Sequence, residues 1–151
     1  HFRYLLLQKF PTERFTTVTK LTFTPNSKLE NEKAGLFVAG LSYSNLAIKS
    51  KKDGNYLVYT TCKAADKGKA EKEETIIKLT SNTIYLSVTV SEGAKCQFSY
   101  SFDGDKFTKV NDVFQAEPGK WIGAKVGLFC VRDQQTNDAG YADFDWFRVE
   151  K

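Results

Sequence analysis

Apolar and polar residues alternate with a period of two along much of this chain. One face of the first clear example holds Phe15, Thr17, Thr19, Leu21 and Phe23. Successive side chains of a β-strand point to opposite faces, so this period predicts a strand with one buried face. The next run, Ala34–Leu41, is almost continuously apolar, which is typical of a central strand covered on both faces.

Short polar turns separate the predicted strands. Asp53-Gly54 and Asp103-Gly104 supply the residues that tight hairpin turns require. Three hairpins are therefore predicted: Leu46–Lys49 with Tyr56–Thr61, Glu74–Thr80 with Ile84–Val90 across Ser81-Asn82, and Cys96–Phe102 with Lys106–Val110. Helical spacing is not sustained over three turns in any segment, and strands recur about every ten residues, which is typical of sandwiches and barrels. We predict an all-β protein with two packed antiparallel sheets.

The end of the chain holds two dense apolar runs, Ala124–Val131 and Tyr141–Val149, on either side of a polar loop. A strand that ends a chain in this way is expected in the middle of a sheet, because a loose apolar terminus would remain exposed. Aromatic residues of the predicted strands are interpreted as core. They are Phe98, Phe102, Phe129, Phe144 and Trp146.

Length and composition fit one folded domain over residues 1–151, since the chain has 151 residues, of which 41% are hydrophobic and 14% aromatic. No apolar stretch approaches the roughly 18 residues of a membrane helix, so a membrane partner is not expected. Cys62, Cys96 and Cys130 are widely spaced within apolar patterns. They are interpreted as buried thiols that form no disulfide and no zinc site.

The formal net charge of +4 does not indicate a nucleic-acid partner, because the basic residues are mostly dispersed lysines. The densest run, KAADKGKAEKEE, is balanced by Glu71, Glu73 and Glu74. We interpret this run as a solvated charged loop. The sequence also contains no Met and begins without the features of a signal peptide, so we expect a piece of a longer protein.

Several separated segments resemble one known family. In chain order they are LLLQKFP, FTTVTKLTFTPN, KAGLFVAGLSYSNLAI, CQFSYSFDGDKF, GKWIGAKVGLF and GYADFDWFRV. Together they resemble the C-terminal concanavalin A-like β-sandwich, a jelly roll, of family 43 glycoside hydrolases, which include β-xylosidases and α-L-arabinofuranosidases. The resemblance extends over nearly the whole chain.

The resemblance implies a location and a role for this domain. In the family the sandwich follows a five-bladed propeller that carries the catalytic carboxylates. The chain would then be a non-catalytic accessory module from the C-terminal end of a glycoside hydrolase that acts on xylan or arabinoxylan. Its partner would be the propeller of the same polypeptide, whose substrate pocket it would help to shape, in the periplasm or outside the cell. Family sandwiches usually begin a few dozen residues earlier, so an unpaired sheet edge is expected.

Asp143 and Asp145 are the first candidate site. Two residues apart on a strand, their Cα atoms would be about 6.5–7 Å apart, a spacing that glycosidase carboxyl pairs also show. Catalysis is disfavoured because an acid and a base need different environments, and these two share one strand. The resemblance implies a structural calcium at Asp145, and calcium prefers carboxylate and carbonyl oxygens. Hydrogen bonding or ion pairing to Arg148 or a lysine is the remaining alternative.

Tyr43, Trp121 and Tyr141 are candidates for contact with a xylan-type oligosaccharide or with the propeller. We expect Tyr43 and Tyr141 in loops and Trp121 at the entrance of a strand, where an aromatic residue can also simply cap the core. The loop Gly40–Leu46 and the loop before Ala34 are further candidates for the domain contact. An independent carbohydrate-binding module or lectin is the alternative function.

Overall fold

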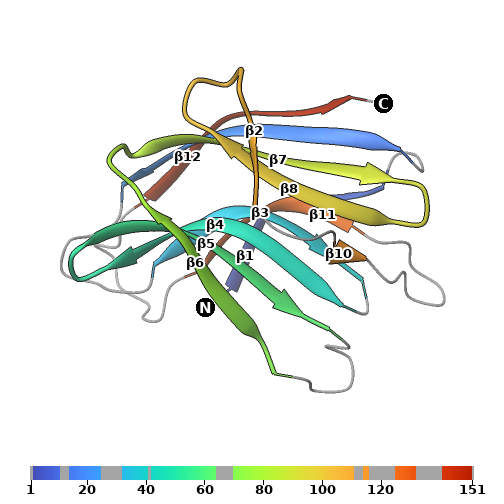
Figure 1. The fold of residues 1–151 in the computed structure, drawn as a ribbon, viewed down its shortest axis with the longest axis horizontal. Helices are drawn as coiled ribbons and strands as arrows, with labels where there is room; N and C mark the ends of the chain where they lie inside the picture. The colour runs from blue at the N-terminus through green and yellow to red at the C-terminus, as the bar shows by residue number, and fades with distance from the viewer. Residues whose placement is uncertain are drawn as a thin grey trace.

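The chain forms two antiparallel β-sheets packed face to face in the computed structural model (Figure 1). The structure describes residues 2–10, 14–24, 32–40, 42–63, 70–110, 114–115, 125–131 and 141–150. The strands are β1 (Phe2–Lys9), β2 (Phe15–Thr24), β3 (Lys33–Ala39), β4 (Tyr43–Lys51), β5 (Gly54–Cys62), β6 (Lys72–Lys78), β7 (Thr83–Ser91), β8 (Lys95–Ser101), β9 (Thr108–Lys109), β10 (Phe114–Gln115), β11 (Lys125–Val131) and β12 (Tyr141–Glu150). Within these residues, no helix is long and apolar enough to cross a membrane.

One sheet, called sheet A, has the strand order β1-β11-β3-β4-β5-β6. The other, sheet B, has the order β10-β8-β7-β2-β12, and β9 pairs with β8. All pairings within both sheets are antiparallel. The predicted fold class, an all-β sandwich of two sheets, is confirmed.

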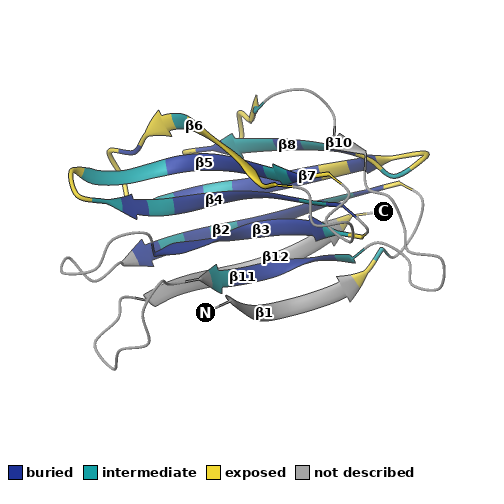
Figure 2. Cartoon of the chain, turned by 90° about the horizontal axis from the view of Figure 1, so that it is seen from below, coloured by how far each residue is buried: buried dark blue, intermediate teal, exposed yellow. Residues whose placement is uncertain are grey.

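The main core lies between the two sheets and is built by the period-two pattern. Sheet A contributes Leu36 and Leu46, and sheet B contributes Leu21, Leu86 and Phe98, all almost completely buried. Figure 2 shows the buried strands β3 and β4 within sheet A. Because the inward residues alternate with outward ones, each sheet also has a face turned away from this core.

Several predicted elements are confirmed. The run Ala34–Leu41 corresponds to β3, which lies between β11 and β4 near the middle of sheet A. Hairpins form across Asp53-Gly54, where β4 pairs with β5, and across Asp103-Gly104, where β8 pairs with β9. The three cysteines are thiols rather than disulfides, and Cys62 and Cys96 are buried.

The predicted hairpin between Glu74–Thr80 and Ile84–Val90 is wrong. β6 pairs with β5 at the edge of sheet A, whereas β7 lies between β2 and β8 in sheet B. The connection therefore crosses from sheet A to sheet B. Just before β7 begins, the Asn82 carbonyl accepts a hydrogen bond from the backbone N–H of Phe23 on β2 at 2.9 Å. β6 is exposed along most of its length, as expected for a charged strand at the edge of a sheet.

Two of the predicted core aromatics lie elsewhere. Phe102 is 50% exposed, because β8 ends at Ser101 and the turn carries the next side chain into solvent. Phe129 is buried, but on the outward face of sheet A rather than between the sheets. The side chains of Phe144 and Trp146 lie outside the described residues.

The C-terminal strand was expected in the middle of a sheet, and this is also wrong. β12 pairs only with β2 among the described strands, which places it at an edge of sheet B. The other C-terminal run, β11, does have two neighbours, β1 and β3. β1, which holds most of the LLLQKFP segment, has β11 as its neighbour and lies at an edge of sheet A among the described strands.

Candidate functional site

The face of sheet A that is turned away from the core, called here the outer face, combines apolar and charged side chains. Cross-strand pairing places one row of its residues in the order Phe37, Asn45, Thr60 and Glu73. The row thus has an aromatic residue on β3, one polar residue on each of β4 and β5, and a carboxylate on β6. The row brings together positions that are far apart in the sequence.

Apolar residues form the floor of the outer face. Phe37, Ala47, Val58 and Phe129 make a second buried cluster, separate from the main core. The rings of Phe37 and Phe129 meet edge to face with centroids 6.1 Å apart. Tyr56 packs against this cluster from β5 while remaining half-buried. We call these four buried residues the outer apolar cluster.

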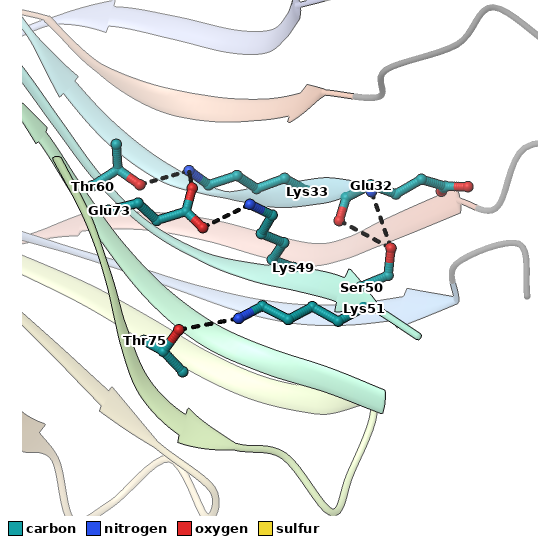
Figure 3. Close-up of polar contacts among 8 residues, drawn as sticks. All are labelled: Glu32, Lys33, Lys49, Ser50, Lys51, Thr60, Glu73 and Thr75. Atoms are coloured by element: carbon teal, nitrogen blue, oxygen red, sulfur yellow. Dashed lines mark hydrogen bonds and ion pairs between the residues drawn. The ribbon is translucent and has the colours of Figure 1, made fainter. Parts of the chain in front are cut away.

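Two lysines share one carboxylate above this floor (Figure 3). Lys49 Nζ lies 2.7 Å from Glu73 Oε1, and Lys33 Nζ lies 3.8 Å from Glu73 Oε2. Lys33 Nζ also donates to Thr60 Oγ1 at 2.7 Å. Lys33 and Lys49 are opposite one another on β3 and β4, so both side chains reach across β5 toward β6. We call Lys33, Lys49 and Glu73 the lysine–glutamate cluster.

The lysine–glutamate cluster is partly removed from water. The side chains of Lys33, Lys49 and Glu73 are 11%, 20% and 28% exposed. Burial lowers the pKa of Lys33, although the negative charge of Glu73 opposes that shift. Burial alone would raise the pKa of Glu73, but the hydrogen bond from Lys49 and the positive charges of Lys33, Lys49 and Lys51 outweigh it and lower the pKa. The cluster therefore holds one carboxylate between two ammonium groups.

Neighbouring contacts fix the strands that carry the cluster. Glu32 N–H donates to Ser50 Oγ at 3.0 Å, and Ser50 N–H donates to the Glu32 carbonyl at 2.8 Å, so the start of β3 is tied to the end of β4. Lys51 Nζ donates to Thr75 Oγ1 at 3.2 Å and lies 4.6 Å from the centroid of the Tyr56 ring. Figure 3 shows the Glu32–Ser50 contacts and the Lys51–Thr75 hydrogen bond beside the cluster.

Asn45 is the unusual member of the polar row. It is only 6% exposed, and its Oδ1 atom has no hydrogen-bond partner among the described residues. Its neighbours across the strands are Phe37 and Thr60, the residue that accepts from Lys33. A buried acceptor without a donor is rare in native proteins and calls for a physical explanation.

Tyr43 is the one candidate aromatic whose side chain the structure describes. It begins β4 rather than lying in a loop, so that expectation is wrong, and the preceding turn is confined to residues 40–42. Tyr43 Oη donates to Glu71 Oε2 in a very short hydrogen bond. Burial, followed by the contact with Glu71, raises the pKa of Tyr43. Tyr43 therefore stands as a neutral, anchored hydrogen-bond donor.

Tyr141 is not brought to Tyr43. Tyr141 begins β12 opposite Thr24, in sheet B, and again is not in a loop. β12 begins at the end of the sandwich where β2 ends, whereas β4 begins at the opposite end, where β3 ends (Figure 1). Trp121 lies outside the described residues, as does the loop immediately before Glu32.

Asp143 and Asp145 lie on β12, and their side chains are outside the described residues. Asp143 is opposite Thr22, but the register with β2 shifts between Phe144 and Trp146, so Asp145 stands at a bulge. The regular alternation assumed for two residues on one strand is interrupted there. No group of three or more His, Cys, Asp or Glu residues that could hold a metal occurs within the part of the chain that is described.

Sequence reasoning missed the lysine–glutamate cluster. Glu71 and Glu73 were assigned to a solvated charged loop, but Glu71 accepts from Tyr43, and Glu73, on β6, contacts both cluster lysines. The available signal was the position of Lys33 and Lys49, each next to an apolar run, Ala34–Ala39 on β3 and Leu46–Ile48 on β4.

Comparison with known proteins gives a consistent result. A family model described as the β-xylosidase C-terminal concanavalin A-like domain matches residues 2–150. A β-xylosidase of Formosa agariphila is 39% identical over 73 residues, which are 48% of this chain and 12% of that protein.

Solved structures support the same fold. A xylan β-1,4-xylosidase of Bacillus halodurans C-125 superposes with a TM-score of 0.74 and 17% identity. The superposition covers 96% of this chain and 29% of the other. A bifunctional GH43-CE protein of Bacteroides eggerthii gives a TM-score of 0.75 and 22% identity, covering 95% of this chain and 18% of the other. The chain thus spans less than a third of each of these relatives.

Proposed function

Because the chain belongs to the family of β-xylosidase C-terminal concanavalin A-like domains, we propose that it is a non-catalytic accessory module of a family 43 glycoside hydrolase. In this proposal it packs on the catalytic propeller of the same polypeptide and helps to shape the pocket for a xylan-type substrate. The observation that carries the proposal is the family match over residues 2–150, together with relatives several times longer than this chain.

Three of the described carboxyl groups lack the raised pKa that a catalytic acid requires. The shifts resolved for Asp53, Glu73 and Asp103 are all downward, and the backbone donors around Asp103 lower its pKa to about 2. A glycosidase needs one carboxyl group with a raised pKa to protonate the leaving group. These three groups are instead acceptors of hydrogen bonds and partners of cations.

The end of the sandwich at which β4 begins is the surface we assign to the propeller. Tyr43 is opposite Ala39, which is in turn opposite Lys125, the first residue of β11. Trp121 precedes Lys125 by four positions in the sequence, and the proposal assigns it to the same contact as Tyr43. Two aromatic candidates are thereby assigned to one contact, and Tyr141 is assigned to none.

Substitution in the complete polypeptide tests this assignment. We expect Trp121→Ala and Tyr43→Ala each to lower kcat/KM for an aryl xyloside about tenfold, which corresponds to about 1.4 kcal/mol of lost transition-state stabilisation. The matched control is Lys109→Ala, an exposed residue on β9. Unchanged kcat/KM in both aromatic variants would contradict the role at the pocket. Saturable xylo-oligosaccharide binding by this chain alone, abolished by the same substitutions, would favour an independent carbohydrate-binding module.

Calcium on β12 is a separate proposal. The register shift leaves Asp145 without an opposite residue on β2, and calcium prefers carboxylate and backbone carbonyl oxygens as ligands. Asp145, with Asp143, would hold the ion, whose contribution would be structural. We expect a chelator to lower the melting temperature by several degrees and Asp145→Asn to remove that difference, measured by thermal denaturation. Equal melting curves with and without chelator would exclude the ion.

A further inference from the structure

The lysine–glutamate cluster carries an excess of positive charge. Within the described residues, Lys33 and Lys49 contact one carboxylate, that of Glu73, while Glu71, which accepts from Tyr43, acts on Lys33 only at longer range. Lys51, on the same face, donates to the neutral Thr75 hydroxyl. Since partly buried charges are stabilised by partners of opposite sign, a second carboxylate would complete the pairing of Lys33 and Lys49.

Asn45 indicates that the ligand also carries a hydrogen-bond donor. Its Oδ1 atom, buried in the polar row beside Thr60, lacks a donor among the described residues. A carbonyl oxygen accepts from a hydroxyl or an N–H but gains nothing from a fully ionised anion such as phosphate. A ligand that satisfies both features must therefore carry a carboxylate and a hydrogen-bond donor close together.

We propose that the outer face of sheet A binds a uronate-bearing oligosaccharide, with the sugar carboxylate between Lys33 and Lys49 and a sugar hydroxyl donating to Asn45 Oδ1. A uronate joins these two groups within one ring. The choice of a sugar over an acidic peptide rests on the proposed function, in which the chain is a module of a glycoside hydrolase. The site would let that module retain acidic side branches of a heteroxylan.

The side chains of the proposed site differ in how far solvent reaches them. The ends of Lys49 and Glu73 reach the surface, because their side chains are 20% and 28% exposed. Asn45 Oδ1 is covered, and Lys33 Nζ is held by Thr60 Oγ1 at 2.7 Å. Binding therefore requires the Lys33 ammonium group to leave Thr60 and turn to the ligand carboxylate, and it requires Asn45 Oδ1 to become accessible to the sugar. The outer apolar cluster beneath keeps its place.

Titration calorimetry on the 151-residue chain tests the proposal. The probe is xylotriose substituted with one glucuronic acid, compared with unsubstituted xylotriose and with free glucuronate at the same ionic strength. We expect saturable binding of the acidic oligosaccharide and at least tenfold weaker binding of xylotriose. Weaker binding of free glucuronate would show that the chain as well as the acid is recognised. Equal binding of xylotriose, or absence of saturable binding of the acidic probe, would overturn the proposal.

Matched variants test the assigned contacts. Lys49→Gln and Lys33→Met should each raise Kd for the acidic probe at least tenfold, and Asn45→Ala should weaken both the acidic and the neutral probe. Lys51→Gln is the control, since Lys51 lies on the same strand and face but contacts Thr75, and it should change Kd less than twofold. Unchanged Kd in both cluster variants, or tighter binding of a polyglutamate peptide than of the sugar, would refute the site.

The two proposals can fail separately. If the acidic probe does not bind but Trp121→Ala still lowers the activity of the complete polypeptide, only the uronate site is lost. If the probe binds and Trp121→Ala has no effect, the outer-face site stands and the role at the propeller pocket is lost. Circular dichroism on every variant distinguishes a lost contact from a lost fold, and Lys49→Gln, at a partly exposed position, keeps the test decisive if Asn45→Ala does not fold.

Discussion

Replacement of Gly35 by alanine is expected to lower the free energy of unfolding by about 3 kcal/mol or more, the upper part of the range for overpacked sites. A Cβ atom at Gly35 would overlap the carbonyl oxygen of Leu46 and lie 2.6 Å from the Cα atom of Ala47. Both are backbone atoms of β4, the neighbour of β3 in sheet A. Relief of the overlap requires the two strands to separate, because backbone within a close-packed sheet cannot rotate away as a side chain can.

Two other glycines provide graded controls in the same urea denaturation series. Gly93 has φ +83° with no atom within 4 Å of an added Cβ, so Gly93→Ala measures only the cost of a left-handed conformation, about 1 kcal/mol. Gly104 has φ +79°, and its added Cβ would lie 2.9 Å from the ring of Tyr85, which can move. We expect the destabilisation to rise from Gly93→Ala through Gly104→Ala to Gly35→Ala. A urea midpoint for Gly35→Ala at or above that of Gly93→Ala would show that the two strands separate easily.

The sequence predicts β3 but not this close approach. Ala34–Leu41 is recognisable as a central strand because it is apolar on both faces, and the structure confirms it. The need for glycine at position 35 depends on the distance between β3 and β4, which arises only when the whole sheet is assembled. Period-two alternation reports which face a residue occupies, and it carries no information about the spacing of neighbouring strands.

The incorrect hairpin has a related cause. Glu74–Thr80 and Ile84–Val90 are adjacent in the sequence and separated by turn residues, so local reasoning pairs them. β6 instead completes sheet A beside β5, and Leu79 N–H donates to the Asn55 carbonyl at 2.8 Å just before the chain crosses to sheet B. Alternation looks the same in both arrangements. The choice of sheet is decided by long-range packing, which a single sequence does not display.

The lysine–glutamate cluster could not be predicted for the same reason. Its members lie on β3, β4 and β6 and meet only through the register of four neighbouring strands. Glu73 also belongs to a run of alternating charges, which usually indicates a solvated segment. What the sequence does indicate is that Lys33 directly precedes the apolar run of β3 and that Lys49 follows Leu46–Ile48 on β4, and a lysine beside buried apolar residues needs a partner.

Replacement of Glu73 by glutamine is expected to lower the free energy of unfolding by about 2 kcal/mol at neutral pH. The value lies between that of exposed ion pairs, 0–1 kcal/mol, and that of broken buried pairs, 3–5 kcal/mol, because Glu73 is partly exposed and Lys33 nearly buried. The substitution leaves two ammonium groups without their shared anion. By contrast, Lys33→Met removes the buried charge together with its need for a partner, so we expect a loss of less than about 1 kcal/mol. Urea denaturation at several pH values measures both.

The pH dependence separates this electrostatic explanation from a simple packing defect. Burial lowers the pKa of Lys33 in the folded chain, so the unfolded chain binds more protons between that value and the ordinary one of 10.5, and stability rises with pH in this window. Loss of Glu73 removes a charge that opposes the shift, so the deficit of Glu73→Gln should shrink from pH 7 toward pH 10. On the acid side, the lowered pKa of Glu73 means that the native pairing is present above pH 4.5 and is lost as pH falls through the folded value. The curves of the native chain and Glu73→Gln should therefore converge in acid as well.

Lys33→Met must show a different profile if this account is correct. Without the buried ammonium group, the rise of stability toward pH 10 should disappear. Because Lys49 and Glu73 keep their contact at 2.7 Å, the loss of stability at acid pH should remain. Lys51→Gln, outside the cluster, should retain both the rise of stability toward pH 10 and the loss of stability in acid. A constant deficit for Glu73→Gln from pH 4 to pH 10, or a loss for Lys33→Met as large as that for Glu73→Gln, would mean that shape rather than charge holds this part of the outer face together.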